Sequence, residues 1–328
     1  MKKRQVLGTC LFVFCSGKAF AKVVFWLSIQ CSHYTMKDFH LADYRVDKPV
    51  VLSKVPTHED WGRKKKLEED LDAVGKQVAA IQNKMYAYDK YAVLICIQGM
   101  DTAGKDSLIR EVFKNFNARG VVVHSFKVPT ELERGHDYLW RHYIALPERG
   151  KFAIFNRTHY ENVLVTRVHP EYILGESLPG IHSMEDVNDD FWASRFEQIN
   201  NFEKTIQQNG TIILKFFLHL SKDEQKNRLL RRLEKEDKNW KFSAGDLKER
   251  KLWDEYQACY EDAINKTSRP HAPWYIVPAD DKPTARLIFA TIMLHELSRY
   301  KDVKEPQLDS ETKSHIDEYK KQLESGTI

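Results

Sequence analysis

Five short apolar runs recur along the chain, and segments with the helical spacing of apolar residues separate them. The fourth run is almost wholly apolar, as expected for a strand that a parallel sheet buries on both faces. Strands that alternate with helices predict an α/β fold, with a five-stranded parallel sheet flanked by helices. The predicted strands are 92–97, 120–126, 150–155, 211–218 and 274–278.

Apolar residues spaced three and four apart mark the predicted helices. Between Glu59 and Tyr88 they form one stripe among charged residues, which predicts a long helix packed on the core or on a partner. Gly210 is placed to end the long helix before the fourth strand. The other predicted helices are 133–146, 184–209, 253–265, 283–300 and 308–324.

The composition is that of a globular protein rather than a disordered one. The 328 residues are 42% hydrophobic and 30% charged, enough for one large domain or two small ones. Neither an internal repeat nor a low-complexity linker is apparent, so we expect one domain at 36–302 and a helix or tail at 303–328. The net charge of +4 is too small for a general nucleic-acid binder, but it is compatible with local binding of a polyanion.

A glycine loop follows the first predicted strand and opens a helix. Gly99 and Gly104 stand five apart and Lys105 follows, so the loop can turn its backbone N–H groups inward, with Ala103 among them, to bind phosphates. The strand before it and the helix after it are the context that a P-loop requires. Asp106 occupies the place of the usual Ser or Thr, and its carboxylate can still serve as an oxygen ligand for a metal.

The third strand ends in a second polar stretch. Asn156 stands where P-loop enzymes commonly carry a metal-assisting aspartate, so it can offer only a neutral oxygen. We therefore expect Asp101 and Asp106 to supply the negative charge for the metal. The guanidinium of Arg157 would lie beside the transferred phosphoryl group, where it can bind two oxygens at once.

Two further segments fit a nucleotide-kinase core. Residues 221–251 hold eleven Lys and Arg against seven Asp and Glu, and we interpret them as a helical lid that closes over phosphates. Asp280 follows the fifth strand, where a purine ring is expected. The lid arginines are Arg228, Arg231 and Arg232.

The first 35 residues imitate a secretory signal, with a basic start, an apolar run and small residues after it. Met36 begins a polar stretch typical of a cytosolic N-terminus. We favour an N-terminal extension over a signal, because an enzyme that uses a nucleotide needs the compartment that holds it, and the segment is too short for a convincing membrane span. Beyond it, Cys96 and Cys259 have neither disulfide nor zinc spacing, which indicates a reduced, cytoplasmic protein.

Taken together, the motifs resemble the polyphosphate kinase 2 family over about residues 45–300. The motifs are longer and more specific than a P-loop alone. Many members carry aspartate at the position of Asn156. In having asparagine there, the chain resembles the subgroup that phosphorylates both nucleoside mono- and diphosphates. The motifs are Gly99–Asp106, Ser125–Thr130, His136–Arg141, Phe155–Glu161 and Asn239–Phe242.

The resemblance implies a thymidylate-kinase-like core with a helical lid, and the reversible transfer of a terminal phosphoryl group from inorganic polyphosphate to a nucleotide such as AMP, ADP, GMP or GDP, with Mg²⁺ or Mn²⁺. It implies catalytic roles for Asp101, Lys105, Asp106, Arg157 and Glu161, with both aspartates as metal ligands. It further implies that other residues bind the nucleotide or polyphosphate. It implies neither a nucleic-acid nor a membrane partner, and it is compatible with a homo-oligomer. Those binding residues are Gly99, Ala103, Gly104, Lys127, Arg141, Asn156, Arg167, Arg228, Arg231, Arg232 and Asp280.

Two other functions share some of these features. A nucleoside monophosphate kinase that uses ATP as donor would have the same loop, sheet and lid. A P-loop protein that binds nucleotide without turnover is suggested by the absent Ser or Thr and the absent strand-end aspartate. A nucleic-acid binder is poorly supported, because the sequence has neither a recognition helix nor a basic sheet motif with interleaved aromatic residues.

Overall fold

The computed structural model describes residues 39–240 and 242–326. Our prediction of an N-terminal extension at 1–35 therefore lies outside the described residues. In the described part, no helix is long and apolar enough to cross a membrane.

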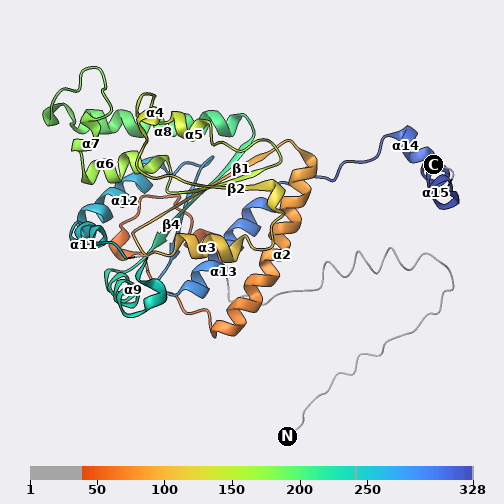
Figure 1. The fold of residues 1–328 in the computed structure, drawn as a ribbon, viewed down its shortest axis with the longest axis horizontal. Helices are drawn as coiled ribbons and strands as arrows, with labels where there is room; N and C mark the ends of the chain where they lie inside the picture. Colours follow the sequence, from red (N-terminus) through yellow and green to blue (C-terminus); the bar gives the residue numbers. More distant parts are fainter. Residues whose placement is uncertain (1–38, 241, 327–328) are drawn as a thin grey trace, which may run out of the picture. The chain divides into compact units, whose positions relative to one another are not determined.

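Five parallel strands form the sheet, as the apolar runs predicted (Figure 1). Their order across the sheet is β2-β3-β1-β4-β5, so β1 lies in the centre and pairs with β3 on one side and β4 on the other. The carboxyl ends of these three strands therefore meet at one edge, at a point where the strand order reverses. The strands are β1 (Ala92–Gly99), β2 (Val121–Ser125), β3 (Phe152–Asn156), β4 (Thr211–His219) and β5 (Trp274–Pro278).

Alternate residues of the strands face two different helical layers, because successive strand side chains point to opposite faces. On one face, Leu94 and Phe155 join the buried cluster that contains Phe202 of α8 (Asp189–Gln208), and α12 (Trp253–Thr267) packs beside α8. On the other face, Phe289 of α13 (Lys282–Leu297) contacts Phe216 of β4, and α13 lies along α2 (Lys64–Tyr88).

Several predicted helices have different bounds in the structure. The segment 133–146 forms two short helices, α4 (Glu131–Arg134) and α5 (Trp140–Tyr143), because Thr130 caps the first and Gly135 ends it. The helix predicted from Met184 begins only at Asp189, since the Asn188 side chain caps it by accepting the N–H of Phe191. The long helix predicted from Glu59 likewise begins later, at Lys64.

The segment predicted as a lid is helical, in three pieces that follow β4. They are α9 (Lys222–Glu234), α10 (Glu236–Asn239) and α11 (Ala244–Lys251).

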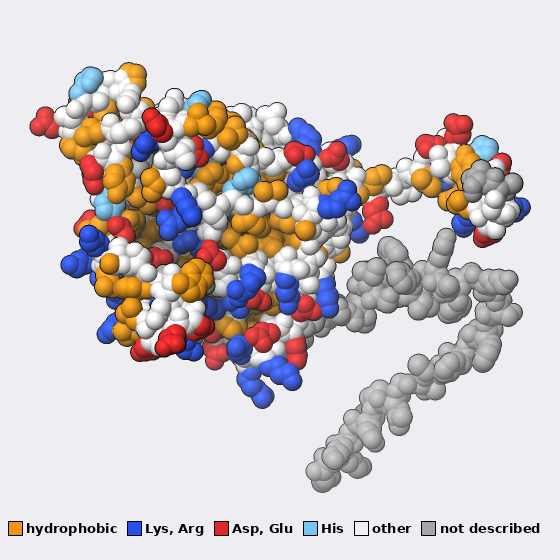
Figure 2. All heavy atoms as spheres, in the orientation of Figure 1, with side chains coloured by type: hydrophobic (Ala, Val, Ile, Leu, Met, Phe, Trp, Pro, Cys, Tyr) orange, Lys and Arg blue, Asp and Glu red, His pale blue; other side chains and the backbone are white. Residues whose placement is uncertain are grey.

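Charged side chains of both signs are mixed over the face of the molecule that Figure 2 shows. The remaining elements are η1 (Leu41–Asp43), η2 (Leu52–Lys54), α3 (Lys105–Val112), η3 (Ala118–Gly120), η4 (His159–Val163), α6 (Val165–Val168), α7 (Glu171–Leu174), η5 (Met184–Asp186), α14 (Ser310–Ser314) and α15 (Ile316–Ser325).

Candidate active site

The glycine loop joins the end of β1 to the start of α3, as predicted. Its two glycines are needed for different reasons. A Cβ added to Gly99 would lie 3.0 Å from the main-chain oxygen of Leu218 in the neighbouring strand β4. Gly104 has a φ of +104°, and Thr102 has a φ of +63°, a conformation that costs a non-glycine residue energy and that concentrates at functional sites.

Lys105 folds back over this loop. Its Nζ donates to the main-chain oxygens of Gly99 at 2.7 Å and Met100 at 3.3 Å. Burial and the nearby Arg157 lower the pKa of Lys105, while the carboxylates of Asp101, Glu161 and Asp106 oppose that shift. The lysine is thus held at the centre of a group of opposite charges.

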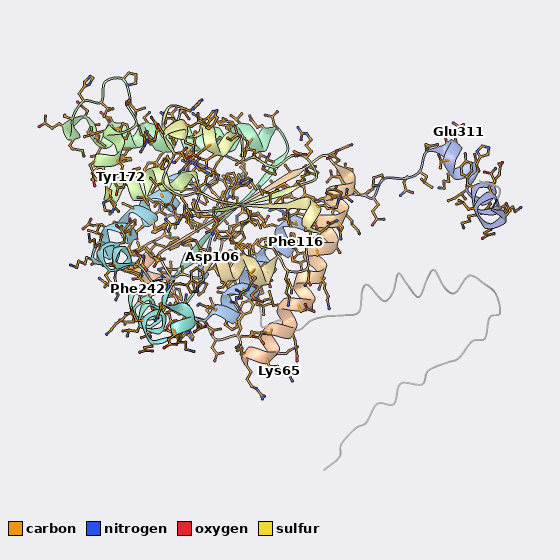
Figure 3. All side chains as sticks on the ribbon, in the orientation of Figure 1. Lys65, Asp106, Phe116, Tyr172, Phe242 and Glu311 are labelled. Carbon is orange, nitrogen blue, oxygen red and sulfur yellow. The ribbon has the colours of Figure 1, made fainter. Side chains whose placement is uncertain are left out.

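Asp106 and Asn156 lie together, because β1 and β3 are neighbours in the sheet. The Asn156 Nδ2 donates to Asp106 Oδ1 at 2.7 Å and reaches Ser125 Oγ at 3.4 Å. The amide oxygen of Asn156 is buried and accepts no hydrogen bond from the described residues. Asp106 itself is exposed at the start of α3 (Figure 3).

Arg157 directly follows β3, and Glu161 lies in the short helix η4 that comes after it. Arg157 has a φ of +58°, and its side chain is 52% exposed. Thr158 then caps η4 by accepting the N–H of Tyr160, and the short helix brings Glu161 back toward Arg157. The Glu161 Oε2 lies 3.9 Å from Arg157 Nη1, so the two side chains form an ion pair in the site.

A cavity of about 290 Å³ opens beside the loop. Of the described side chains that line it, seven are basic and two are acidic, which makes it a site for an anion. Burial, together with the neighbouring Arg228, Arg286 and Arg231, lowers the pKa of Lys282 to about 8. The basic residues are Lys105, Arg157, Arg228, Arg231, Arg232, Lys238 and Lys282, and the acidic ones are Asp101 and Asp106.

A second, smaller cavity of about 90 Å³ also has Lys105 in its wall. It shares Asp101, Lys105 and Arg157 with the first cavity. Its other residues differ in character, because two tyrosines and three carboxylates contribute to it. The residues that only this cavity has include Glu161, Asp246, Glu249, Arg250, Tyr256 and Tyr260.

Most of the residues predicted from the sequence line one of these cavities. Those in the first are Asp101, Gly104, Lys105, Asp106, Asn156, Arg157, Arg228, Arg231 and Arg232, and Gly99 and Glu161 are in the second. Ala103 belongs to the loop but lines neither. Lys127, Arg141, Arg167 and Asp280 are likewise not among the described residues that line the two cavities.

Protein partners hold the side chains of Arg141, Arg167 and Asp280 elsewhere. Arg141 donates to the main-chain oxygen of Lys127 at 2.8 Å, and Arg167 pairs with Asp262 at 2.5 Å. The two carboxylate oxygens of Asp280 accept hydrogen bonds from Ser221 N and Thr57 Oγ1, both at 2.8 Å. Binding of polyphosphate by Arg141 and Arg167, and of nucleotide by Asp280, stays a prediction that this arrangement does not favour. The side chain of Lys127 is exposed, and its binding of polyphosphate stays a prediction.

Arg228 lines the first cavity, but its donors point into the protein. A guanidinium has five N–H groups, and five protein acceptors lie within hydrogen-bonding distance. Direct phosphate binding would require Arg228 to release them, so the geometry is that of a positioning residue. The acceptors are Glu224 Oε1 (2.8 Å) and the main-chain oxygens of Thr102 (3.0 Å), Ala103 (2.9 Å), Ala279 (2.6 Å) and Asp280 (2.8 Å).

Sequence reasoning missed Lys282, Lys238 and the two tyrosines. Lys282 follows the exit of β5, and only the structure shows that its side chain reaches the glycine loop, with Cε 3.6 Å from the position that a Cβ on Gly104 would take. Lys238 belongs to the basic lid segment, which gave a signal without singling out the residue. Tyr256 and Tyr260 occur on α12 with ordinary core spacing and carried no signal.

The oxygen ligands at the loop fit a hard divalent cation. Asp101 and Asp106 carry carboxylates into the first cavity, and the buried amide oxygen of Asn156 has no hydrogen-bond donor. In the described part of the chain, no three His, Cys, Asp or Glu side chains are grouped to hold a metal by themselves. A divalent cation at this place would therefore depend on water and substrate phosphates for its remaining ligands.

Comparison with known proteins gives consistent matches. The sequence model of the family described as Polyphosphate kinase 2 matches residues 62–306. The ADP-polyphosphate phosphotransferase of Rhodopseudomonas palustris is 44% identical over 254 residues, which cover 77% of this chain and 87% of that protein. The AMP/ADP-polyphosphate phosphotransferase of Meiothermus ruber is 45% identical over 219 residues, covering 67% of this chain and 76% of that protein.

A solved structure agrees with these matches in fold. The crystal structure of polyphosphate kinase 2 from Arthrobacter aurescens TC1 superposes with a TM-score of 0.75 at 33% identity, covering 84% of this chain and 95% of that chain. The family match begins before α2, ends beyond α13 and includes the glycine loop, the turn after β3 and the lid segment. The chain therefore belongs to the polyphosphate kinase 2 family.

Proposed function

We propose that the protein transfers the terminal phosphoryl group of inorganic polyphosphate to a nucleoside mono- or diphosphate, in a reversible reaction that needs Mg²⁺ or Mn²⁺. The observation that carries the proposal is the pair of cavities that meet at Asp101, Lys105 and Arg157. A donor in one cavity and an acceptor in the other would meet at these three side chains. The names of the similar proteins, which include polyphosphate with ADP or with AMP and ADP, support both substrates.

The first cavity suits the polyphosphate chain. Apart from Arg228, whose donors are taken by protein acceptors, its basic side chains come from the start of α3, the turn after β3, α9, α10 and α13, so they can follow an extended polyanion rather than one phosphate. Repulsion between the donor chain and an anionic acceptor would otherwise oppose their approach. Arg231 is exposed on α9 and is the lid arginine placed to contact the chain directly.

The second cavity suits the acceptor nucleotide. Tyr256 and Tyr260 offer aromatic surface, while Arg157 stands at the junction where the acceptor phosphate must arrive. At about 90 Å³ the cavity is too small for a whole nucleotide. Movement of α11, which contributes Asp246, Glu249 and Arg250, would widen the cavity to admit the nucleotide, as a lid that opens and closes over substrates requires.

The chemistry asks for charge stabilisation and alignment rather than covalent catalysis. An oxygen of the acceptor's terminal phosphate forms the new P–O bond while the bond to the next phosphate of the donor breaks, and the donor leaves one unit shorter. Lys105 and Arg157 would stabilise the negative charge on the transferred group, and Glu161 would orient Arg157 through their ion pair. Asp101 and Asp106 would hold a divalent cation, which would neutralise further phosphate charge.

Use of both mono- and diphosphates as acceptors is the finer part of the proposal. It rests on Asn156, because asparagine at this position resembles the sequence of the subgroup that accepts both nucleoside mono- and diphosphates. Among the similar proteins, one is named for ADP and another for AMP and ADP. We further propose that the enzyme works in the cytoplasm, where nucleotides are held, and that it needs no nucleic-acid partner.

The test uses purified full-length protein with Mg²⁺, polyphosphate and each of AMP, ADP, GMP and GDP, with nucleotide products separated by chromatography. ADP or ATP that accumulates only with polyphosphate present supports the proposal, and the ratio of acceptors tests the subgroup. Products formed from a monophosphate with ATP, but not with polyphosphate, would leave the fold and replace the function by that of a nucleoside monophosphate kinase. Nucleotide binding without any transfer would point to a non-catalytic P-loop protein.

A further inference from the structure

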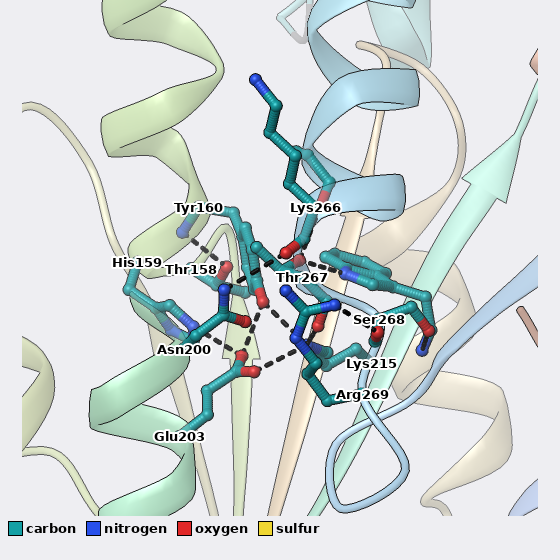
Figure 4. A network of polar contacts seen from close by, with 12 residues as sticks. Thr158, His159, Tyr160, Asn200, Glu203, Lys215, Lys266, Thr267, Ser268 and Arg269 are labelled. Carbon is teal, nitrogen blue, oxygen red and sulfur yellow. Dashed lines mark hydrogen bonds and ion pairs between the residues drawn. The ribbon is translucent and has the colours of Figure 1, made fainter. Parts of the chain in front are cut away.

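A buried polar network joins His159 and Tyr160 of η4 to Glu203 and Lys215 (Figure 4). In sequence, these two η4 residues lie between Arg157 and Glu161. The centre of the network is the ion pair between Lys215 of β4 and Glu203 of α8, with Nζ and Oε2 2.6 Å apart and both side chains 0% exposed. Removing two charges from water costs several kcal/mol per ion before their attraction compensates. A pair in this position therefore calls for a reason other than simple core stability.

The two residues between Thr158 and Glu161 are both bound to this pair. The Tyr160 hydroxyl donates to Glu203 Oε1 at 2.7 Å and accepts from Lys215 Nζ at 2.8 Å. The His159 Nε2 lies 3.0 Å from the same Oε1. Glu203 and Lys215 thus bind η4 through the two residues that directly precede Glu161.

The remaining partners fix the network itself. Lys215 also donates to the main-chain oxygen of Thr267 at 2.8 Å, and the Trp274 indole donates to the Thr267 hydroxyl at 2.9 Å. Burial by itself would raise the pKa of the Glu203 carboxyl, but Lys215 and His159 outweigh it and lower that pKa below its usual range. The carboxylate therefore stays an acceptor for both η4 side chains.

We propose that Glu203, Lys215 and Tyr160 are positioning residues, which fix the turn after β3 so that Arg157 and Glu161 face the reacting phosphates. Arg157 is the reason such support is needed, because its φ of +58° is unfavourable for a residue with a side chain. Directional hydrogen bonds can hold one orientation of a turn, whereas apolar packing of the same volume would leave it less constrained. The inference rests on the proposed function, since it gives Arg157 and Glu161 their roles.

The experiment is a double-mutant cycle on the full chain, with kcat for polyphosphate-dependent transfer as the measured quantity. Tyr160→Phe removes only the hydroxyl that joins η4 to Glu203 and Lys215, and we expect kcat to fall about tenfold, since small misplacements of aligned groups are costly. In a background that already carries Arg157→Ala and Glu161→Gln, the same change should alter kcat less than about twofold, because there is no longer a group to position. Equal losses in both backgrounds would overturn the proposal.

Two controls separate positioning from stability. Thr291→Val deletes another buried hydroxyl, which bonds the Leu287 main-chain oxygen on α13, and should lower the melting temperature without changing kcat. His159→Leu should lower kcat, while His159→Gln, whose amide can replace Nε2, should restore most of it. The histidine pair also serves if Tyr160→Phe does not fold, and loss of activity in Leu and Gln variants alike would count against positioning through Glu203.

The wild-type protein distinguishes this inference from the function on which it depends. If it shows no polyphosphate-dependent transfer, the proposed function fails and the cycle has no activity to measure. If it is active and the cycle is additive, the function stands and the positioning role is rejected.

Discussion

Asn156 Nδ2 donates to Asp106 Oδ1 at 2.7 Å, which joins the end of β3 to the first turn of the P-loop helix. The amide of Asn156 therefore stabilises the Asp106 carboxylate, whereas a second carboxylate at position 156 would repel it. Because Asp106 is one of the two proposed metal ligands, the contact links the identity of residue 156 to metal binding.

We expect Asn156→Asp to make folding depend on a divalent cation. Without metal, the two carboxylates would repel and the melting temperature should fall, by the few degrees that about 1–2 kcal/mol represents in a domain of this size. Addition of Mg²⁺ should restore it, whereas the wild type should change little. Asn156→Ser, which removes the donor without adding a charge, is the control. An equal response of both variants to Mg²⁺ would contradict this role of residue 156.

Arg228 and Arg231 should separate loop support from substrate binding, although both lie on α9. Arg228→Ala leaves the main-chain oxygens of the glycine loop and of the β5 exit without their donor, so we expect a loss of about 2–4 kcal/mol in unfolding free energy and a fall in kcat. Arg231→Ala removes an exposed charge and should raise KM for polyphosphate severalfold at an unchanged melting temperature. Thermal melts and steady-state kinetics on the two variants test this, and a higher KM alone for Arg228→Ala would show that it binds substrate instead.

Because the pKa of Lys282 is lowered, we expect a loss of polyphosphate affinity at mildly alkaline pH. Its pKa of about 8 means that its positive charge disappears as the pH rises through that value, so kcat/KM for polyphosphate, which reports the free enzyme, should decline above pH 8. Lys282→Arg keeps the charge and should move the decline to higher pH. A profile that is identical in both proteins would exclude Lys282 as its source.

The same shift has an opposite consequence for stability. Because the folded pKa of Lys282 lies below its ordinary value of 10.5, the unfolded chain binds more protons between about pH 8 and 10.5, and this residue's contribution to stability increases with pH over that window. Chemical denaturation of the wild type and of Lys282→Met across this range should show a smaller increase in the variant.

Gly99→Ala should disturb the strand pair rather than only the loop. The added Cβ would meet the Leu218 main-chain oxygen at 3.0 Å, and since backbone cannot move aside easily, we expect a destabilisation of about 1–3 kcal/mol with loss of activity. Gly135→Ala is the matched control, because Gly135 has a φ of −71° and an added Cβ would come no closer than 3.5 Å to its neighbours. Urea denaturation of both variants measures the difference, and equal effects would show that close packing at β4 is not the cause.

The strands, their order in the chain and the P-loop could be predicted from the sequence, because each depends on local spacing. The apolar run 212–218 is buried, and Gly99, Gly104 and Lys105 shape the glycine loop through neighbouring backbone. The same holds for Arg157 and Glu161, which follow directly on a predicted strand and reach the site through one short turn.

Only the tertiary structure decided which distant side chains complete the site. The start of α13 brings Lys282 to the glycine loop, and the packing of α12 brings Tyr256 and Tyr260 to the second cavity. In sequence, none of the three differs from an ordinary core or surface residue. Conversely, the basic character of Arg228 and the strand-end position of Asp280 suggested ligand contacts, yet main-chain and side-chain partners hold both in place. Charge along a sequence shows that a residue can bind an anion, whereas the partners that compete for its hydrogen bonds are set by residues far away in the chain.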